Sequence, residues 1–197
     1  MKVVAISRPD FFEGEELAIQ LLIDEGLDSI HIRKPDAKAH KVAALLDKIP
    51  ESYYPNIVLN GCFELLADYN VGGIHLNSRN SEPPAGFTGA AGFSCHSVEE
   101  VALRCDEMDY CFLSPIYDSI SKSGYASGFS HHILSDAAAK GIINEKVIAL
   151  GGVTPERIPA LKCYNFGGSA VLGYIWDSPT LMDLRDKMRL LRKYSDR

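Results

Sequence analysis

The chain has 197 residues, of which 46% are hydrophobic and 23% are charged, enough apolar material for one sizeable core. Its net charge is −6 and its Lys and Arg residues are scattered singly, so it offers no basic face to nucleic acid or to an anionic membrane. The first residues form no apolar signal segment, and no stretch reaches membrane-spanning length. We therefore expect one cytoplasmic domain over residues 1–197 that binds small solutes.

Short β-branched runs alternate with helical patterns along the whole chain, which favours repeated βα units around a parallel sheet. The runs are nearly continuous in apolar character, as strands covered on both sides should be, and eight such strands close a barrel. We predict a (β/α)8 TIM barrel, with an open doubly wound sheet as the alternative. The candidate strands span residues 3–7, 28–33, 56–60, 72–76, 90–94, 110–114, 146–150 and 169–173.

The segments between these strands contain helices with recognisable ends. The pattern over residues 15–26 places Leu17, Leu21 and Ile23 on one side and ends at a glycine. Residues 178–194 begin with Ser-Pro, a typical helix start, and carry an apolar stripe. Residues 77–89 contain two prolines and little helical period, so we expect a short helix or none there.

Five cysteines occur without CxxC spacing, and three of them lie in apolar segments where a buried thiol is ordinary. We predict neither a disulfide nor a metal site from these residues, which fits a reducing compartment. They are Cys62, Cys95, Cys105, Cys111 and Cys163.

In a TIM barrel the functional residues sit at the carboxyl ends of the strands, and here those positions are polar and cationic. Such a set is typical of an anion site, most simply for phosphate. Arg33 is the hardest to explain otherwise, because a guanidinium at a strand end needs an anionic partner. The other candidates are Ser7, Arg8, His31, Lys34, Asn60, His75, Asn77, Ser94, His96, Ser119, Ser121, Lys122, Gly151, Gly152, Leu172 and Gly173.

Each candidate also has an ordinary structural explanation. A lysine in an exposed loop, such as Lys122, is usually a solvated charge, and a glycine pair after a strand often serves only the turn. His31 and His75 lie within strands, where a histidine is more often a hydrogen-bonded barrel residue than an acid or base. These alternatives stay open at the level of the sequence.

The motifs, taken together, resemble those of thiamine phosphate synthase and the related thiazole tautomerase. They read IHIRK, GGIHLNS, GFSCHSVEEV, DYCFLSPIYDSISKSG, IALGGV and GGSAVLGYI, and they cover nearly the whole chain. The resemblance implies a barrel of about this size that acts on small phosphorylated substrates. A synthase of this family joins a pyrimidine methyl pyrophosphate to a thiazole phosphate and releases pyrophosphate with Mg²⁺.

The resemblance assigns roles by position. Arg33 and Lys122 would meet the pyrophosphate as catalytic residues, and His31 and Lys34 belong to the same substrate-binding strand end. Asn60 would face the pyrimidine. The remaining positions would hold phosphate oxygens, and they are Ser94, Ser119, Ser121, Gly152, Leu172 and Gly173.

Two departures concern the metal. Where the family places its Mg²⁺-binding aspartates, this chain has Gly61 and Asn80. Mg²⁺ favours carboxylate ligands, so its usual protein ligands are absent. The family's lysine after Arg33 is replaced by Pro35, and Lys34 is the nearest cationic substitute.

Three functions follow from this pattern. The first is a synthase, which we expect from whole-chain similarity. The second is a tautomerase-like isomerase with His75 or His96 as general base, although Pro115 stands where the family's catalytic histidine would align. The third is a non-catalytic protein that binds a thiazole phosphate. Tyr53, Tyr54 and Trp176, if exposed, would either mark the interface of a homo-oligomer or simply cap the barrel.

Overall fold

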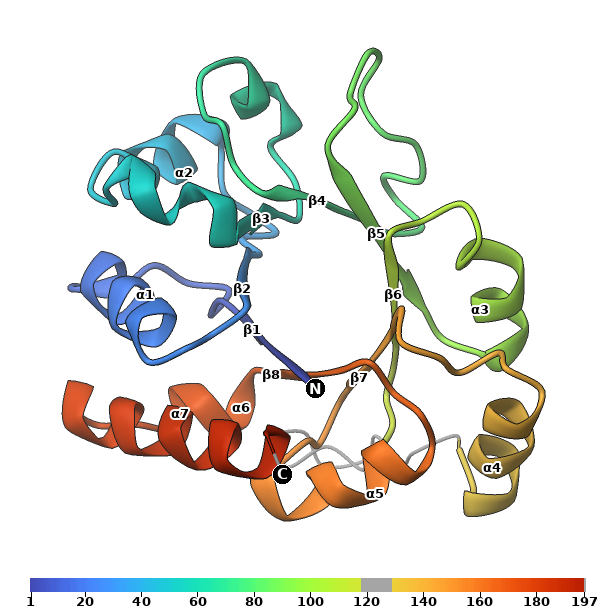
Figure 1. Cartoon of the computed structure of the whole chain (residues 1–197). Coiled ribbons are helices and arrows are strands. Elements are labelled where there is room, and N and C mark those ends of the chain that lie inside the picture. Colours follow the sequence, from blue (N-terminus) through green and yellow to red (C-terminus); the bar gives the residue numbers. More distant parts are fainter. Residues whose placement is uncertain (118–128, 197) are drawn as a thin grey trace.

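The computed structural model describes residues 1–117 and 129–196 and shows eight parallel strands closed into a barrel (Figure 1). Each strand pairs with the next, and the last pairs with the first through Lys2 and Gly168, which excludes the open sheet. The predicted TIM barrel is therefore confirmed. The strands are β1 (Lys2–Ile6), β2 (Ser29–Ile32), β3 (Ile57–Leu59), β4 (Gly73–Leu76), β5 (Ala90–Cys95), β6 (Tyr110–Leu113), β7 (Val147–Leu150) and β8 (Gly168–Val171).

Helices surround the barrel, as Figure 1 shows. Residues 77–89 are fully described and contain no helix, as predicted, but only an isolated bridge between Asn77 and Asn80. The α-helices are α1 (Glu15–Asp24), α2 (Ala39–Leu46), α3 (Val98–Arg104), α4 (His131–Ala139), α5 (Ile158–Cys163), α6 (Gly173–Trp176) and α7 (Leu181–Ser195). The 3-10 helices are η1 (Glu51–Asn56), η2 (Phe63–Ala67) and η3 (Pro155–Arg157).

The core has two layers, because successive side chains of a strand point to opposite faces. Along β1, Val3 and Ala5 pack outward in the large cluster under the helices, whereas Val4 and Ile6 belong to a second cluster. That second cluster fills part of the barrel interior. Its buried members are Val4, Ile6, Phe112, Ile148 and Ala170.

Helix α1 buries a face that only partly matches the apolar side indicated by the sequence. Leu21 and Ile23 are partly buried against the core, whereas Leu17 is 54% exposed. The buried positions include Glu15, whose carboxylate reaches Lys34 inside the protein. This ion pair fixes the rotation of the helix, and the residues that follow at helical spacing are buried with it: Ala18, Ile19 and Leu22.

Helix α7 begins two residues later than predicted, because Thr180 rather than Ser178 is its N-cap. The Thr180 hydroxyl accepts from the Asp183 N–H at 3.1 Å, and the Asp183 carboxylate accepts from the Thr180 N–H at 3.1 Å. The apolar stripe is confirmed for Leu184, Met188 and Leu191, which are buried, whereas Leu181, also expected on it, is 48% exposed.

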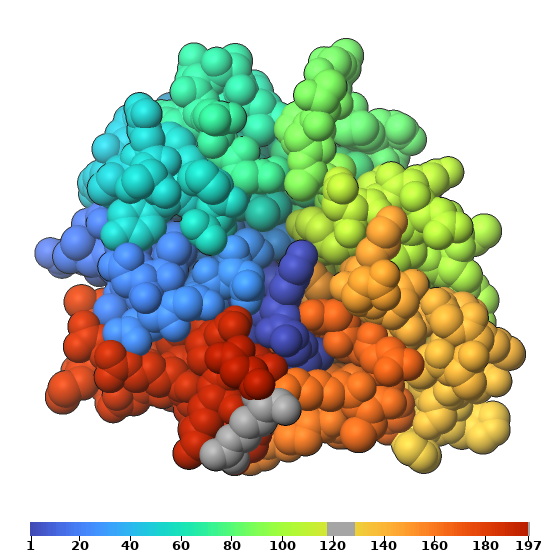
Figure 2. Space-filling model, in the orientation of Figure 1, coloured from blue at the N-terminus to red at the C-terminus, as the bar shows by residue number. Residues whose placement is uncertain are grey.

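The two chain ends meet on one face of the barrel. The Met1 ammonium donates to the Ser195 carbonyl at 3.3 Å, and Figure 2 shows the first residues (dark blue) filling the middle of this face. The opposite face, at the carboxyl ends of the strands, carries the main cavity described below. Within the described residues, no helix has both the length and the apolar character needed to cross a bilayer.

The aromatic residues considered for an interface are buried or half-buried. Tyr54 is only 8% exposed, and Tyr53 and Trp176 are half-buried. The Trp176 indole N–H donates to the Ile6 carbonyl at 2.6 Å and so ties α6 to the end of β1. These three residues therefore belong to the packing of the barrel itself.

Candidate active site

A cavity of about 710 Å³ lies at the carboxyl ends of the strands, a size that suits drug-sized ligands. Most of the candidates from the sequence meet there, so the strand-end prediction is supported by geometry. Those that line it are Arg33, Lys34, Asn60, His75, Asn77, Ser94, His96, Gly151, Gly152, Leu172 and Gly173, together with Gly61 and Asn80 at the expected metal positions. His31 lies beneath the lining, and Ser119, Ser121 and Lys122 lie outside the described residues.

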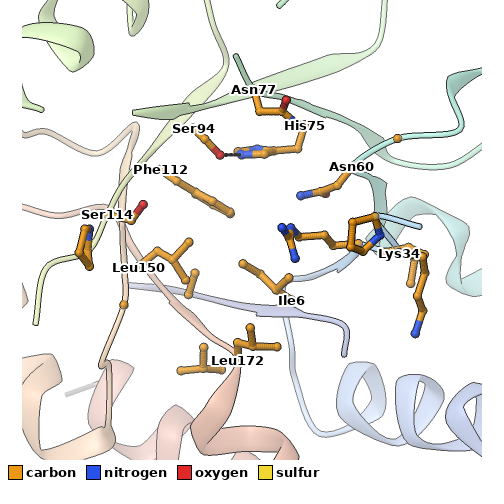
Figure 3. Close-up of a pocket in the computed structure, with 18 of the residues that line it drawn as sticks. Ile6, Lys34, Asn60, His75, Asn77, Ser94, Phe112, Ser114, Leu150 and Leu172 are labelled. Atoms are coloured by element: carbon orange, nitrogen blue, oxygen red, sulfur yellow. Dashed lines mark hydrogen bonds between the residues drawn. The ribbon is translucent and has the colours of Figure 1, made fainter. Parts of the chain in front are cut away.

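The cavity has a polar side and an apolar side (Figure 3). Asn60, His75, Asn77 and Ser94 gather on one side, and the apolar side chains lie across from them. Such a division suits a flat ring with a polar edge, because the ring can rest on the apolar side while its heteroatoms meet hydrogen-bonding groups. The apolar residues labelled in Figure 3 are Ile6, Phe112, Leu150 and Leu172.

Arg33 follows β2 directly, and Ser7 at the end of β1 fixes its backbone. The Ser7 hydroxyl oxygen accepts from the Arg33 N–H at 2.9 Å and lies 3.3 Å from the Arg33 carbonyl oxygen. Within the described part of the chain, no carboxylate forms an ion pair with the Arg33 guanidinium, which is exposed at the cavity wall. Its charge is thus available to an anionic ligand.

Lys34 differs from Arg33 because its ammonium is directed away from the cavity (Figure 3). It donates to Glu15 at 2.6 Å and to the carbonyls of Arg8 and Asp10 at 2.9 Å each. Burial raises the pKa of Glu15 and lowers that of Lys34, while their mutual hydrogen bond opposes both shifts. The structure therefore does not bring the Lys34 charge together with Arg33 as a substrate-binding pair.

The two strand histidines are satisfied residues of the barrel interior. His31 Nδ1 lies 3.0 Å from Asn60 Oδ1, and His75 Nε2 lies 2.8 Å from Ser94 Oγ. Burial lowers the pKa of His31 to about 3 and that of His75 well below its ordinary value. Both rings are neutral at pH 7, and both nitrogens of His75 already have partners, which leaves His75 no free nitrogen to act as a base.

His96, the other candidate base, is exposed and lines the cavity. Its Nδ1 lies 3.1 Å from the Ser114 carbonyl oxygen, an atom that can only accept, and 3.4 Å from the Ser114 hydroxyl oxygen. When Nδ1 donates to the carbonyl, the nearer of the two, Nε2 of the neutral ring keeps a free lone pair.

The turn after β7 brings backbone close to the cavity. Gly151 and Gly152 have φ values of 100° and 62°, which side chains disfavour. A Cβ on Gly151 would lie 2.9 Å from Pro115, so only glycine fits against the segment after β6. Arg157 donates to the Gly152 carbonyl and lies over the Tyr117 ring, which joins the same two segments.

Arg79 also lines the cavity, although its sequence pattern does not mark it as a site residue. Asn77 holds the turn that carries it, since Asn77 Oδ1 accepts from the Arg79 N–H at 2.9 Å. The turn closes through backbone bonds of 3.1 Å between Asn77 and Asn80. The only sequence signal was its place one residue before Asn80, in a segment with no helical or strand period.

The side chains that line the cavity are not suitable ligands for Mg²⁺. The lining residues that the structure describes include no Asp or Glu, and no group of three metal-ligating side chains occurs in the described ranges. Gly61 has no side chain and Asn80 offers a neutral amide, whereas Mg²⁺ is held through carboxylates and phosphates. Arg33 and Arg79 instead give the lining positive charge, and we call the part of the lining that they form the cationic wall.

Comparison with known proteins places the chain in a family. The profile described as thiamine monophosphate synthase matches residues 3–175. The chain is 37% identical to thiamine phosphate pyrophosphorylase from Bacteroides thetaiotaomicron, whose crystal structure superposes with a TM-score of 0.91 over 100% of this chain and 98% of that one. The same enzyme from Pyrococcus furiosus, 16% identical, shares the fold with a TM-score of 0.80 over 99% of this chain and 95% of that one.

A curated relative gives the same result. The thiamine-phosphate synthase of Limosilactobacillus reuteri is 26% identical over 145 residues, which are 70% of this chain and 66% of that protein. The resemblance inferred from the motifs is thus confirmed, and the closed barrel agrees with it. Since the family profile spans most of the barrel, this chain belongs to the thiamine monophosphate synthase family.

Proposed function

We propose that the cavity joins two small phosphorylated substrates in the manner of a thiamine phosphate synthase. The bond from the pyrimidine methylene carbon to the diphosphate oxygen breaks, and its electron pair leaves with pyrophosphate. The thiazole ring nitrogen supplies the electron pair of the new carbon–nitrogen bond. The protein's task is to hold both substrates in line and to stabilise the charge that develops on the leaving group.

The observation that carries this proposal is the combination of a cationic wall with a divided cavity. Arg33 and Arg79 face a space whose described lining contains no carboxylate, so an anionic ligand meets attraction without a competing charge. Asn60 and Ser94 lie beside the space that a ring would occupy. A diphosphate joined to a heterocycle matches both features at once.

Backbone groups at the far side suit a second phosphate. Gly152 and Gly173 line the cavity, and no acceptor within the described residues is recorded for either N–H group. Gly173 begins α6, where the first amides lack intrahelical partners. We assign the thiazole phosphate to these amides and to Leu172, and we assign Ser119, Ser121 and Lys122 to the diphosphate.

The residues of this cationic wall also determine whether the protein requires a metal ion. Because the described residues do not fit Mg²⁺, we propose that guanidinium groups take over neutralisation of the diphosphate. Calorimetric titration with inorganic pyrophosphate should then give the same dissociation constant in EDTA and in Mg²⁺, within about a factor of three. Binding that disappears in EDTA would show that a divalent cation is needed.

The catalytic roles can be tested with matched arginine variants. Arg33→Gln should lower kcat/KM for thiamine phosphate formation roughly 100-fold, because it removes a charged donor from the leaving group. Arg185→Gln is the control, since Arg185 pairs with Glu25 on the outer surface. Lys122→Ala should also lower the rate. Unchanged turnover in Arg33→Gln would contradict the assignment of the diphosphate to this wall.

One observation favours a second candidate, an isomerase that acts on a thiazole phosphate. When His96 Nδ1 donates to the Ser114 carbonyl, the neutral ring presents a free lone pair at Nε2, which is what a general base requires. In that case His96→Gln should abolish double-bond migration in a thiazole carboxylate phosphate, followed by ultraviolet absorbance. It should leave thiamine phosphate formation nearly unchanged if the first proposal is right.

A further inference from the structure

Beneath the cavity, five polar side chains form a continuous chain of hydrogen bonds across the barrel. Asn60 follows β3, and the other four come from β2, β6, β4 and β5. The contacts are Asn60 Oδ1 to His31 Nδ1 at 3.0 Å, His31 Nε2 to Tyr110 OH at 3.4 Å, Tyr110 OH to His75 Nδ1 at 3.2 Å, and His75 Nε2 to Ser94 Oγ at 2.8 Å. Both ends line the cavity, whereas His31 and Tyr110 do not.

Each imidazole in this chain has a single proton. The two histidines are each 1% exposed, and aromatic rings surround them, with Phe112 at 4.9 Å from His31 and 4.3 Å from His75 between ring centroids. No carboxylate contacts either ring in the described structure. A second proton on a ring would therefore be a buried charge without a counter-ion.

A chain of neutral imidazoles and hydroxyls must run in one direction, because each ring donates from one nitrogen and accepts at the other. Asn60 Oδ1 can only accept, so His31 Nδ1 donates and Nε2 accepts from Tyr110. The Tyr110 oxygen then accepts from His75 Nδ1, and His75 Nε2 accepts from the Ser94 hydroxyl.

This direction decides what the two ends offer to a ligand. The amide nitrogen of Asn60 points into the cavity as a donor (Figure 3), and no protein acceptor is recorded for it within the described residues. The Ser94 proton is directed to His75, so Ser94 presents only lone pairs. A phosphate oxygen, which only accepts, cannot bind Ser94 in this state.

The opposite direction contains the same number of protons. In it Ser94 donates to the cavity, both imidazoles carry their proton on Nε2, and the rotated amide of Asn60 presents its oxygen. No part of the chain can reverse alone, because two neighbours would then both donate or both accept across one contact.

We propose that a phosphate group at Ser94 reverses this chain and so turns Asn60 from a donor into an acceptor for an amino group on the ring of the same substrate. Tyr110 is then a positioning residue that links recognition of the diphosphate to recognition of an aminopyrimidine edge. The inference rests on the proposed function, since it needs a ligand that carries both groups.

The coupling determines which substituent the substrate ring must carry in order to bind at Asn60. An amino group donates, and it finds an acceptor at Asn60 only when phosphate holds the chain in the reversed state. Pyrophosphate should therefore strengthen binding of the free hydroxymethyl aminopyrimidine by about fivefold or more, the usual scale of coupling between two sites. The Tyr110→Phe variant lacks the central hydroxyl, so this gain should vanish.

The test is ¹⁵N NMR of the histidine side chains during titration with inorganic pyrophosphate. Wild-type protein should move from Nδ1–H to Nε2–H at both His31 and His75. In Tyr110→Phe, His75 should still change while His31 keeps its Nδ1 proton. Tyr53→Phe, which removes a surface hydroxyl bonded to Asp24, should behave as wild type. If Tyr110→Phe does not fold, His31→Gln replaces it. The measurement is then only whether pyrophosphate strengthens binding of the aminopyrimidine.

The outcomes separate the two proposals. If pyrophosphate shifts the backbone amides of Arg33 or Ser94 but both imidazoles keep their tautomers, the chain does not reverse and this inference is wrong. The same holds if His31 changes as fully in Tyr110→Phe as in wild type. No shift of any resonance would overturn the proposed function, and this inference with it.

Discussion

Lys34 is a residue whose side-chain direction could not be predicted from the sequence. Its place after a barrel strand predicted a phosphate ligand, yet its ammonium turns back to Glu15, with both side chains 1% exposed. The partner lies 19 residues earlier on another element, so no local pattern reveals it. Arg33, one position before, lines the cavity, where Ser7 holds its backbone, and remains the proposed ligand of the diphosphate.

Removal of the Glu15 carboxylate tests this arrangement. Glu15→Gln should lower the free energy of unfolding by about 3 kcal/mol, because it leaves a buried ammonium without its counter-charge. Urea denaturation at pH 7 measures the change. The double variant Glu15→Leu/Lys34→Met should recover much of the loss, since it buries no charge. A loss below about 1 kcal/mol in the single variant would mean that the pair is solvated.

At the scale of elements, the turn after β7 sets the far wall of the cavity. Gly151 must keep φ at 100° beside Pro115, and the same turn presents the Gly152 amide. The turn thus depends on the segment that follows β6, which packs against it through the Ile116 and Tyr117 backbone.

Gly151→Ala should therefore reduce stability and weaken phosphate binding together. We expect a loss of about 2 to 3 kcal/mol in the free energy of unfolding from backbone strain and contact with Pro115. Gly86→Ala is the matched control, because Gly86 also has positive φ, 77°, but no atom within 4 Å of its added Cβ. Its loss should stay near 1 kcal/mol, with unchanged binding of thiazole phosphate. Equal effects of the two variants would show that the close approach of Gly151 to Pro115 does not cause the loss of stability.

The elements that the sequence predicted well are those whose pattern reflects burial on both sides. All eight strands occur near their predicted positions, because barrel strands contact helices outside and packed residues inside. On α1, the exposure of Leu17 and the burial of Glu15 did not follow from the sequence, since a buried carboxylate does not look like a core residue. Tyr110 was overlooked although it lies two residues before Phe112, on the same face of β6. Arg79 lies on a turn, where no periodicity points to a site.

At the scale of the whole molecule, the barrel interior is only partly apolar. Val4, Ile6 and Ile148 fill one part, whereas His31, His75 and Tyr110 form a polar layer whose histidines are neutral. The barrel therefore keeps hydrogen-bonding groups directly under its ligand cavity. Their protonation links ligand recognition to the stability of the fold.

This layer predicts a marked loss of stability in acid. Below about pH 6.5 the unfolded chain protonates both histidines while the folded barrel keeps them neutral, so the unfolded state binds more protons. Each histidine then lowers the free energy of unfolding by about 1.4 kcal/mol per pH unit. For His31 this continues to its folded pKa of about 3.

Chemical denaturation at several pH values between 4 and 7 measures this slope. His31→Gln should reduce it by about 1.4 kcal/mol per pH unit, because one buried titrating group is lost. His132→Gln, on the exposed start of α4, is the control and should keep the wild-type slope. A wild-type slope in His31→Gln would show that His31 gains a proton in the folded barrel.

The most direct test of the account is whether the purified protein makes thiamine phosphate. Pyrimidine pyrophosphate and thiazole phosphate are incubated with the protein, and chromatography follows thiamine phosphate and released pyrophosphate. We predict both products in equal amounts, with a rate that Arg33→Gln lowers and Arg185→Gln does not. Absence of product, while thiazole phosphate still raises the melting temperature, would contradict the synthase and leave a cavity that binds phosphate without joining its ligands.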